Sequence, residues 1–261
     1  MRKFYSLLIL VIFIFLGKTF LGTTEKEMNI LELDQDEKTG LVYIKDSKKI
    51  FTGVGKTYYE SGKLESIFRF KDGVLEGNGI GYYESGKISF TFNFTKGNIN
   101  GITKSYYESG KIRTEKKFID GKLDGSSKGY YENGNLKADL FYKNDMLDGT
   151  VIEYLEDGKK TSVSNYKNGK LEGEKLSYYK NGSLYIEANY SNDELDGDIK
   201  VYKKNGDLDY TAPYKNGKPL TAKRLKASDD MIDEISQDLK EILGDDIKIT
   251  VKEENSLEDK K

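Results

Sequence analysis

Residues 58–77 read YYESGKLESIFRFKDGVLEG, and this stretch contains the pattern that predicts the fold. Over residues 64–70, side chains assigned to one face alternate with side chains assigned to the other, and this period of two indicates a β-strand rather than a helix. The pairs Ser61-Gly62 and Asp72-Gly73 flank this strand. Such pairs favour tight hairpin turns, because glycine reaches positive φ without steric cost. The alternation places on one face Leu64, Ser66, Phe68 and Phe70, and 24 residues later Ile88, Phe90, Phe92 and Phe94.

The same pattern recurs every 24 residues without insertion. The glycine of the first turn is found at Gly62, Gly86, Gly110, Gly134, Gly158, Gly182 and Gly206. A tyrosine precedes each of these glycines by four residues, at Tyr58, Tyr82, Tyr106, Tyr130, Tyr154, Tyr178 and Tyr202. An aromatic residue follows each glycine by eight, at Phe70, Phe94, Phe118, Tyr142, Tyr166, Tyr190 and Tyr214. A period of this length predicts a repeat array, in which each unit buries its apolar face by stacking on its neighbours.

Seven copies with two strands each predict an all-β fold. The expected architecture is an elongated, single-layer antiparallel β-meander of tandem 24-residue hairpin repeats, with strands of about six to seven residues. A second glycine series keeps the same period, at Gly77, Gly101, Gly125, Gly149, Gly173 and Gly197. In the strand before the first turn, Gly79 and Gly81 predict a bend or the close approach of another backbone.

The unit Tyr-Tyr-Glu-Ser-Gly-Lys-Leu, followed by Phe-Lys-Asp-Gly-x-Leu-x-Gly, resembles the bacterial variant of the MORN repeat over residues 41–221. The resemblance implies an elongated meander of antiparallel hairpins. It also implies two loose labels, since bacterial members are often described as antitoxin components of toxin–antitoxin modules or as exported 24-residue repeat proteins. The eukaryotic relatives are associated with membrane lipids and scaffolding. This chain lacks tryptophan and its repeats are nearly neutral, which disfavours phosphoinositide binding.

Residues 1–22 differ from the rest of the chain. Arg2 and Lys3 precede an apolar run over residues 4–16, which is short for a membrane span and fits a secretory signal peptide. The small residue Gly22 has Phe20 two positions before it, a poor cleavage site, so an uncleaved N-terminal signal anchor stays open. We therefore expect export to the periplasm or cell surface, with membrane anchoring by residues 4–22 if they are retained.

The remaining chain divides into an N-terminal cap with a partial repeat (23–53), seven repeats (54–221), a C-terminal helix–strand cap (222–251) and a charged tail (252–261). Both prolines, Pro213 and Pro219, fall in the last copy, where proline removes a donor from an edge strand. The short C-terminal α-helix has an apolar stripe formed by Ile232, Ile235, Leu239 and Ile242. We expect this stripe to pack near the last repeats; the alternative is an oligomerisation or partner helix.

Composition excludes several kinds of chemistry. The chain has no histidine and no cysteine, so histidine acid–base catalysis, thiol chemistry, disulfides and ordinary zinc sites are excluded. Its net charge of −2 and the mixed signs along the repeats argue against nucleic acid. The sequence at 34–40 only faintly resembles a calcium loop and predicts an acidic turn. The repeated acids lie along one rim, where solvated turns explain them better than glycosidase catalysis: Glu60, Glu84, Glu108 and Glu132.

We therefore expect no catalytic, cofactor-binding or metal-binding residues, and a non-enzymatic exported scaffold that binds another macromolecule along its sheet. Its partner would be an unidentified protein or cell-envelope component, with membrane contact only through the N-terminal segment. The tyrosine column favours cross-strand packing, but a ladder of sugar-binding rings, and hence a cell-wall glycan-binding module, stays open. An antitoxin-like binder is a third possibility, which export disfavours. The candidate partner surface is the apolar face of the early copies, Phe68, Phe70, Phe92 and Phe94.

Overall fold

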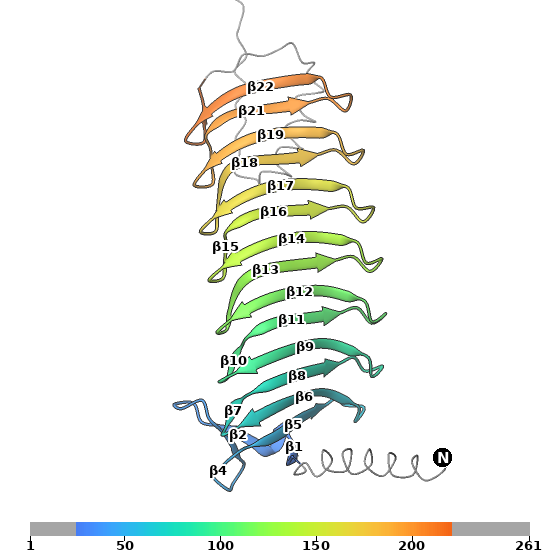
Figure 1. Ribbon diagram of the computed structural model, residues 1–261, viewed down its shortest axis with the longest axis vertical. Coiled ribbons are helices and arrows are strands. Elements are labelled where there is room, and N and C mark those ends of the chain that lie inside the picture. The colour runs from blue at the N-terminus through green and yellow to red at the C-terminus, as the bar shows by residue number, and fades with distance from the viewer. Residues whose placement is uncertain (1–24, 221–261) are drawn as a thin grey trace, which may run out of the picture.

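The computed structural model describes residues 25–220, which form one long sheet with a small cap at its N-terminal end (Figure 1). The sheet contains seven consecutive hairpins: β5 (Gly53–Tyr58) with β6 (Leu64–Lys71), β8 (Gly77–Tyr82) with β9 (Ile88–Thr95), β11 (Gly101–Tyr106) with β12 (Ile112–Ile119), β13 (Lys122–Tyr130) with β14 (Leu136–Lys143), β16 (Gly149–Tyr154) with β17 (Lys160–Lys167), β18 (Lys170–Tyr178) with β19 (Leu184–Ser191), and β21 (Gly197–Tyr202) with β22 (Leu208–Lys215). Neighbouring strands are antiparallel within and between these hairpins. The predicted meander of 24-residue hairpins is confirmed.

The predictions for the two ends of the chain concern residues outside the described part: the signal segment 1–22, the helix–strand cap 222–251 and the tail 252–261. Within residues 25–220, no helix is long and apolar enough to cross a membrane.

Four two-residue strands join one hairpin to the next: β7 (Val74–Leu75), β10 (Asn98–Ile99), β15 (Met146–Leu147) and β20 (Glu194–Leu195). A fifth, β23 (Lys218–Pro219), follows the last hairpin. In the other two copies β13 and β18 run through this position without a break. The second glycine series follows these short strands, and all its members have positive φ, from +84° at Gly77 to +135° at Gly149. These glycines therefore mark the point at which the chain changes direction as it enters the next long strand.

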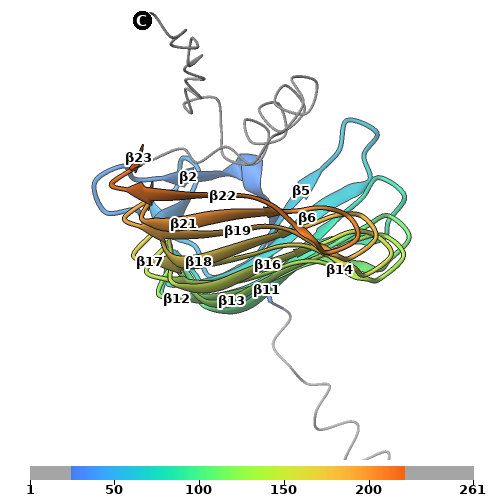
Figure 2. The ribbon, with the colours of Figure 1, turned by 90° about the horizontal axis from the view of Figure 1, so that it is seen from above.

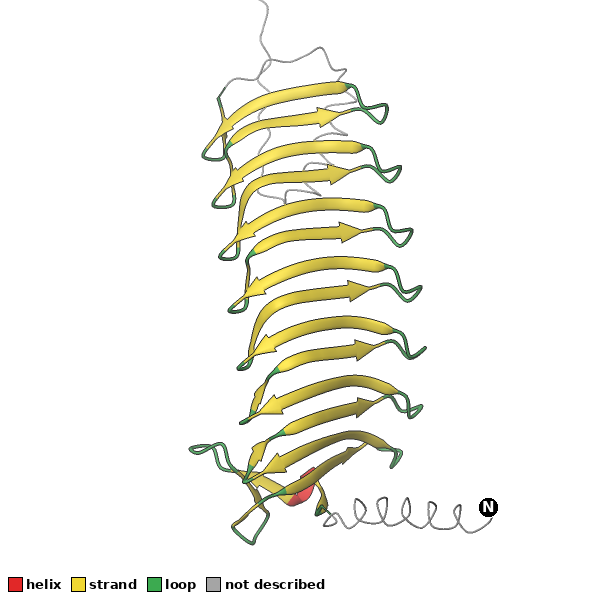
Figure 3. Ribbon diagram, in the orientation of Figure 1, coloured by secondary structure: helices red, strands yellow, loops and turns green. Residues whose placement is uncertain are grey.

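The N-terminal cap covers the first edge of the array. β1 (Glu27–Asn29) pairs with β5 in parallel, and is the exception to the antiparallel rule among the described strand pairs. The 3-10 helix η1 (Ile30–Glu32), drawn red in Figure 3, follows it, and the Asn29 side chain accepts a hydrogen bond from the Leu31 N–H at its start. A separate three-stranded sheet comes next, formed by β2 (Leu33–Gln35), β3 (Val42–Ile44) and β4 (Lys49–Ile50).

The first turn of each repeat is a three-residue loop that ends in glycine. In the first copy the Gly62 N–H donates to the Tyr59 carbonyl (2.8 Å), and the Tyr59 N–H donates to the Lys63 carbonyl (2.9 Å). Gly62 has a φ of +82°, which is the left-handed conformation that this type of hairpin loop requires. The prediction of positive φ is confirmed at all seven turn glycines: Gly62, Gly86, Gly110, Gly134, Gly158, Gly182 and Gly206.

The second turn is a two-residue loop in which both residues have positive φ. Asp72 has a φ of +49° and Gly73 of +80°, as in a type I′ turn. The turns also stack on one another, because the Gly73 N–H donates to the Phe51 carbonyl (2.9 Å) and every later copy repeats this bond. The sequence did not predict that Lys96 (φ +51°) would take the first turn position or Asp145 (φ +66°) the second.

The turn at Lys96 gives a test of this geometry. Lys96→Asn should raise the free energy of unfolding by roughly 0.5–1 kcal/mol, because asparagine tolerates the left-handed conformation better than lysine. Asn168→Lys, at the equivalent position of another copy, is the matched reverse change and should cost a similar amount. Urea denaturation measures both, and a lower midpoint for Lys96→Asn would contradict the turn assignment.

The sheet bows across its width, so that one side is hollow and the other is rounded, and the N-terminal cap lies on the hollow side (Figure 2). In the cap, Ile30 packs over Gly55, where an added Cβ would lie 3.0 Å from Ile30 Cγ1. Gly55 pairs with Phe68, and the two residues share one side of the sheet. We name the side that carries Gly55, Phe68 and the residues in register with them the hollow face, and the other side the rounded face.

The two faces differ in chemistry. The hollow face holds most of the buried residues, including small polar ones at Ser66, Thr103, Ser127, Ser164 and Ser177. The rounded face carries cross-strand ion pairs, Lys104–Glu115 at 3.0 Å and Lys200–Glu187 at 2.6 Å, which are partly exposed. Such exposed pairs contribute little to stability, so the core of this one-layer protein lies on the hollow face.

Candidate functional site

A cluster of phenylalanine rings lies on the hollow face of the first two copies. The ring centroids are 4.9 Å apart for Phe90 and Phe92, 5.9 Å for Phe92 and Phe94, and 6.0 Å for Phe68 and Phe94. Their planes are tilted or edge-on to one another, which is the arrangement that aromatic pairs prefer. We name the group formed by Phe68, Phe90, Phe92 and Phe94 the aromatic patch.

Glycines in the strand between the phenylalanines make room for these rings. A Cβ at Gly79 would lie 2.8 Å from the Phe68 ring, and a Cβ at Gly81 would lie 2.1 Å from the Phe90 ring. The close approach predicted at these two positions is therefore made by aromatic side chains and not by another backbone. The rings cover the β8 backbone at Gly79 and Gly81, so that both glycines are buried.

The structure narrows the partner surface that the sequence predicts. Phe70 and Phe94 are buried, each with 9% of its surface exposed, so they do not offer an open contact surface in the described protein. Phe70 packs against the fully buried Phe51 of the cap, at a centroid distance of 5.5 Å. Phe68 and Phe92 are partly exposed, and so is Phe90, which the sequence prediction left out although it belongs to the same alternation.

The tyrosines form a hydrogen-bonded ladder that the sequence did not predict. It uses the second tyrosine of each Tyr-Tyr pair, whose hydroxyl donates to the backbone carbonyl of the first tyrosine in the next copy. The bonds run from Tyr59 to Tyr82 (2.6 Å), Tyr83 to Tyr106, Tyr107 to Tyr130 (2.7 Å), Tyr131 to Tyr154 (2.7 Å) and Tyr179 to Tyr202 (2.8 Å). The ladder shows a structural role for these tyrosines, since it ties each hairpin to its neighbour.

The middle of the hollow face mixes polar side chains with apolar ones such as the buried Val151. The Ser162 hydroxyl donates to a Glu153 carboxylate oxygen (2.6 Å), and Ser164 pairs with Lys175 across β17 and β18. Burial lowers the pKa of Lys175, while the negative charge of Glu153 acts in the opposite direction. This mixed stretch lies between the aromatic patch and a second apolar region at the last two copies.

The repeated acids Glu60, Glu84, Glu108 and Glu132 lie on exposed turns along one rim, as the repeat spacing predicts. Each is a full repeat from the next, so no two of them face each other across a cleft of the described protein.

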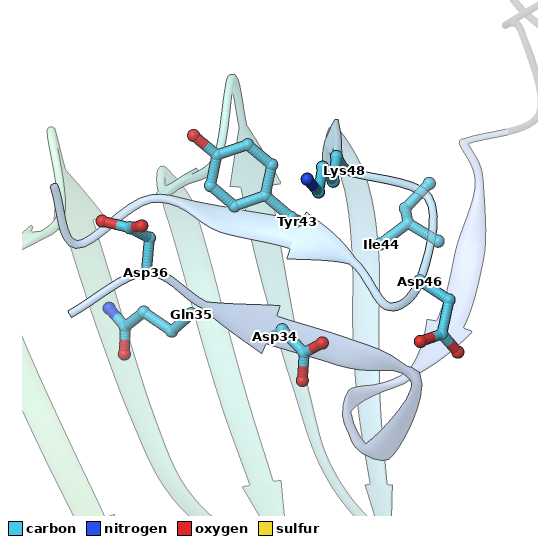
Figure 4. A pocket seen from close by; sticks show the side chains of 7 residues that line it. All are labelled: Asp34, Gln35, Asp36, Tyr43, Ile44, Asp46 and Lys48. Atoms are coloured by element: carbon cyan, nitrogen blue, oxygen red, sulfur yellow. The ribbon is translucent and has the colours of Figure 1, made fainter. Parts of the chain in front are cut away.

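The cap carries a shallow acidic pocket on its three-stranded sheet (Figure 4), lined by Asp34, Gln35, Asp36, Tyr43, Ile44, Asp46 and Lys48. One Asp36 carboxylate oxygen accepts hydrogen bonds from the Thr39 N–H (2.7 Å), the Thr39 hydroxyl (2.9 Å) and the Lys38 N–H (3.0 Å). The bonds from Thr39 are the main cause of a lowered pKa for Asp36. The predicted acidic turn at 34–40 is found only from Asp36 onward, since Asp34 and Gln35 belong to β2. Residues 25–220 contain no group of three or more carboxylates placed to hold a metal ion.

Comparison with known proteins identifies the repeats. The family described as "MORN repeat variant" matches six stretches of 22 residues, 132 of the 261 residues in all: 51–72, 99–120, 123–144, 147–168, 171–192 and 195–216. No curated protein matches the chain. The copy that carries most of the aromatic patch lies between the first two matched stretches, and the structure folds it as a hairpin like the others.

Among solved structures, the chain is similar to one in the crystal structure of a GtfA/B complex bound to UDP and GlcNAc. The identity is 16% and the TM-score is 0.21, over 56% of this chain and 26% of that chain, so this chain spans about a quarter of that protein. A likeness at this level says nothing about the fold or activity of the present chain. The six in-phase matches are of a different kind: they cover half of the residues and coincide with the hairpins, and the chain belongs to the MORN repeat variant family.

Proposed function

We propose that this protein is a non-enzymatic, exported repeat scaffold that binds another protein through the aromatic patch on its hollow face. The observation that carries the proposal is the group of partly exposed rings at Phe68, Phe90 and Phe92, which lie on β6 and β9 to either side of β8. Phe90 contacts Phe92, and the buried Phe94 links Phe92 to Phe68. Clustered aromatic side chains are enriched at the centres of protein interfaces, and exposed apolar patches often mark interaction sites.

The surroundings of the patch support a protein partner. Ser105 pairs with Phe90 on the next strand, and the buried Thr103 and the partly exposed Lys116 follow on the same face. An apolar centre with a polar border is the usual anatomy of a protein interface. The rings also sit on paired strands rather than on loops, so binding would cost little conformational entropy.

Export is supported by the positive and apolar composition of residues 1–22. A secreted or envelope location would give the scaffold a protein partner of the cell surface or periplasm. Fractionation of cells that express the full chain tests this part of the proposal independently of binding.

The test of the binding surface is the double variant Phe90→Lys with Phe92→Glu. Capture of envelope proteins by the full chain should weaken by about tenfold or more, the effect expected when a central aromatic contact is lost. The matched control is Thr91→Glu, which adds a charge to the same strand on the rounded face and should leave capture unchanged. Circular dichroism of all variants verifies that the sheet is retained.

Two outcomes would overturn the proposal. Equal capture by the double variant and the wild-type chain would show that the patch is not the binding surface. Co-sedimentation of the wild-type chain with purified peptidoglycan, lost in the double variant, would instead identify a glycan-binding module.

A further inference from the structure

The last two copies carry an apolar cluster on the hollow face that is more deeply buried than the aromatic patch. We name it the late patch; it is formed by Ile186, Ala188, Tyr190, Ile199, Val201 and Ala212. Ile186, Ile199 and Val201 are each only 2% exposed, and Ala212 is fully buried. Phe90 occupies the column of Ile186 four copies earlier and is partly exposed. The late patch is therefore screened from water in a way that the same face is not at the other end of the array.

Side chains of the described strands, among them Leu171, Tyr210 and Tyr214, pack against the late patch but belong to the same layer. β19, β21 and β22 form a single layer, and the N-terminal cap lies over the opposite end of the sheet (Figure 1). The Tyr190 hydroxyl is also buried and has no hydrogen-bond partner in the described part of the chain. A large apolar side chain on one face of a single layer needs a second layer to be buried this completely.

We infer that residues 228–243 of this same chain dock on the late patch as an amphipathic helix. The chain leaves β23 beside the last hairpin, where the Leu220 N–H donates to the Pro213 carbonyl (2.8 Å), and 41 residues follow. Residues 221–227 can span about 20 Å, enough to reach the middle of the sheet. A helix of this length extends about 24 Å, close to the length of an eight-residue strand.

The shape and charge of the late patch match those expected for residues 228–243. Ala188 and Ala212 hold the columns that Phe68 and Phe92 hold in the early copies, so the late patch has a low centre where an apolar helix stripe can lie. The stripe is the one that the sequence predicts, Ile232, Ile235, Leu239 and Ile242. The segment 228–243 carries six acidic residues and one lysine, and Lys175 borders the patch through its pairing with Ala188. The short connection keeps the segment at high effective concentration, which favours it over a second molecule.

Engineered disulfides in the full chain test the docking, because the chain has no cysteine of its own. Ala212→Cys combined with Leu239→Cys should oxidise readily to a monomer with an internal disulfide. The matched control is Thr211→Cys with Leu239→Cys, since Thr211 is the next residue of the same strand but lies on the rounded face. Ala188→Cys provides a second hollow-face position, and Ile235→Cys a second position in the segment.

Non-reducing electrophoresis and mass spectrometry of the tryptic peptides read the result. Internal disulfides that form much faster with Ala212 or Ala188 than with Thr211 support the inference. Equal rates on the two faces, no disulfide with either segment position, or only dimers linked between molecules would overturn it.

Deletion of residues 221–261 should also expose the late patch and raise the fluorescence of an apolar dye, whereas deletion of 252–261 alone should not. Equal dye fluorescence for the two deletions would likewise contradict the docking.

Discussion

Gly53→Ala should lower the free energy of unfolding by about 2–4 kcal/mol, although it adds a single methyl group. Gly53 has a φ of +150°, a conformation that residues with a Cβ rarely adopt. The added Cβ would lie 2.1 Å from the Lys26 carbonyl oxygen, which belongs to the backbone and cannot rotate away. That carbonyl accepts the Val54 N–H at the start of the parallel β1–β5 pairing, so relief of the clash would separate β1 from the sheet.

Gly62→Ala is the control that separates the clash from the backbone strain. Gly62 also has positive φ, but nothing lies within 4 Å of the Cβ that alanine would add. Its cost should be that of the left-handed conformation alone, about 1–2 kcal/mol. Urea denaturation followed by circular dichroism measures both variants. Equal losses for the two would show that the cap does not press on Gly53.

The repeat sequence predicts the fold because its signals are local and occur seven times. Alternation over residues 64–70 sets the strand and its two faces, and a Ser-Gly, Asn-Gly or Asp-Gly pair marks most of the turns. The register then follows without further information, since shifting a strand by one residue would exchange the hollow and rounded faces. The parallel strand β1 has no such pattern, and its three residues are defined only by their contact with β5.

The candidate site was only partly predictable, because burial depends on contacts between distant segments. Phe70 has the same alternation as Phe68, yet the cap residue Phe51 covers it. The turn at Asp145 shows a similar limit. Its left-handed backbone is compensated by its own carboxylate, which accepts the Leu123 N–H of the preceding copy (2.7 Å), and no local rule for turns includes that bond.

The hollow face differs in side-chain chemistry and burial from one end of the array to the other. The rings at its aromatic end are partly exposed, its middle mixes buried serines with Val151, and the apolar residues at its late end are buried. The proposed partner and the proposed C-terminal helix would therefore bind the same face at opposite ends without competing directly. A substitution in the aromatic patch that weakens partner capture should accordingly leave disulfide formation at the late patch unchanged. Substitutions in the late patch should likewise leave partner capture unchanged.

The tyrosine ladder accounts for how the hairpins between these two ends stay in line. One bond joins each pair of successive copies from the first to the fifth, and another joins the sixth to the seventh. The fifth copy has Leu155 at the ladder position, so its link to Tyr178 is missing. In a repeat array each unit contacts only its neighbours, so the stability of the array is the sum of its units and the interfaces between them. Loss of one tyrosine hydrogen bond should therefore weaken one interface between copies and leave the folds of the individual hairpins intact.

Tyr107→Ala should accordingly cost about 2–3 kcal/mol. The change removes the hydrogen bond to the Tyr130 carbonyl, worth about 1 kcal/mol, together with a half-buried ring and its contact with the Arg113 guanidinium, 5.8 Å from the ring centroid. Tyr107→Phe keeps the ring and should lose only about 1 kcal/mol. Leu155→Tyr supplies the missing rung and should gain about as much, because the turn at 155–159 has the same backbone hydrogen bonds as the turn at 107–111. Denaturation of the three variants measures these differences, and a loss for Leu155→Tyr together with no loss for Tyr107→Phe would mean that the hydroxyls do not hold the copies together.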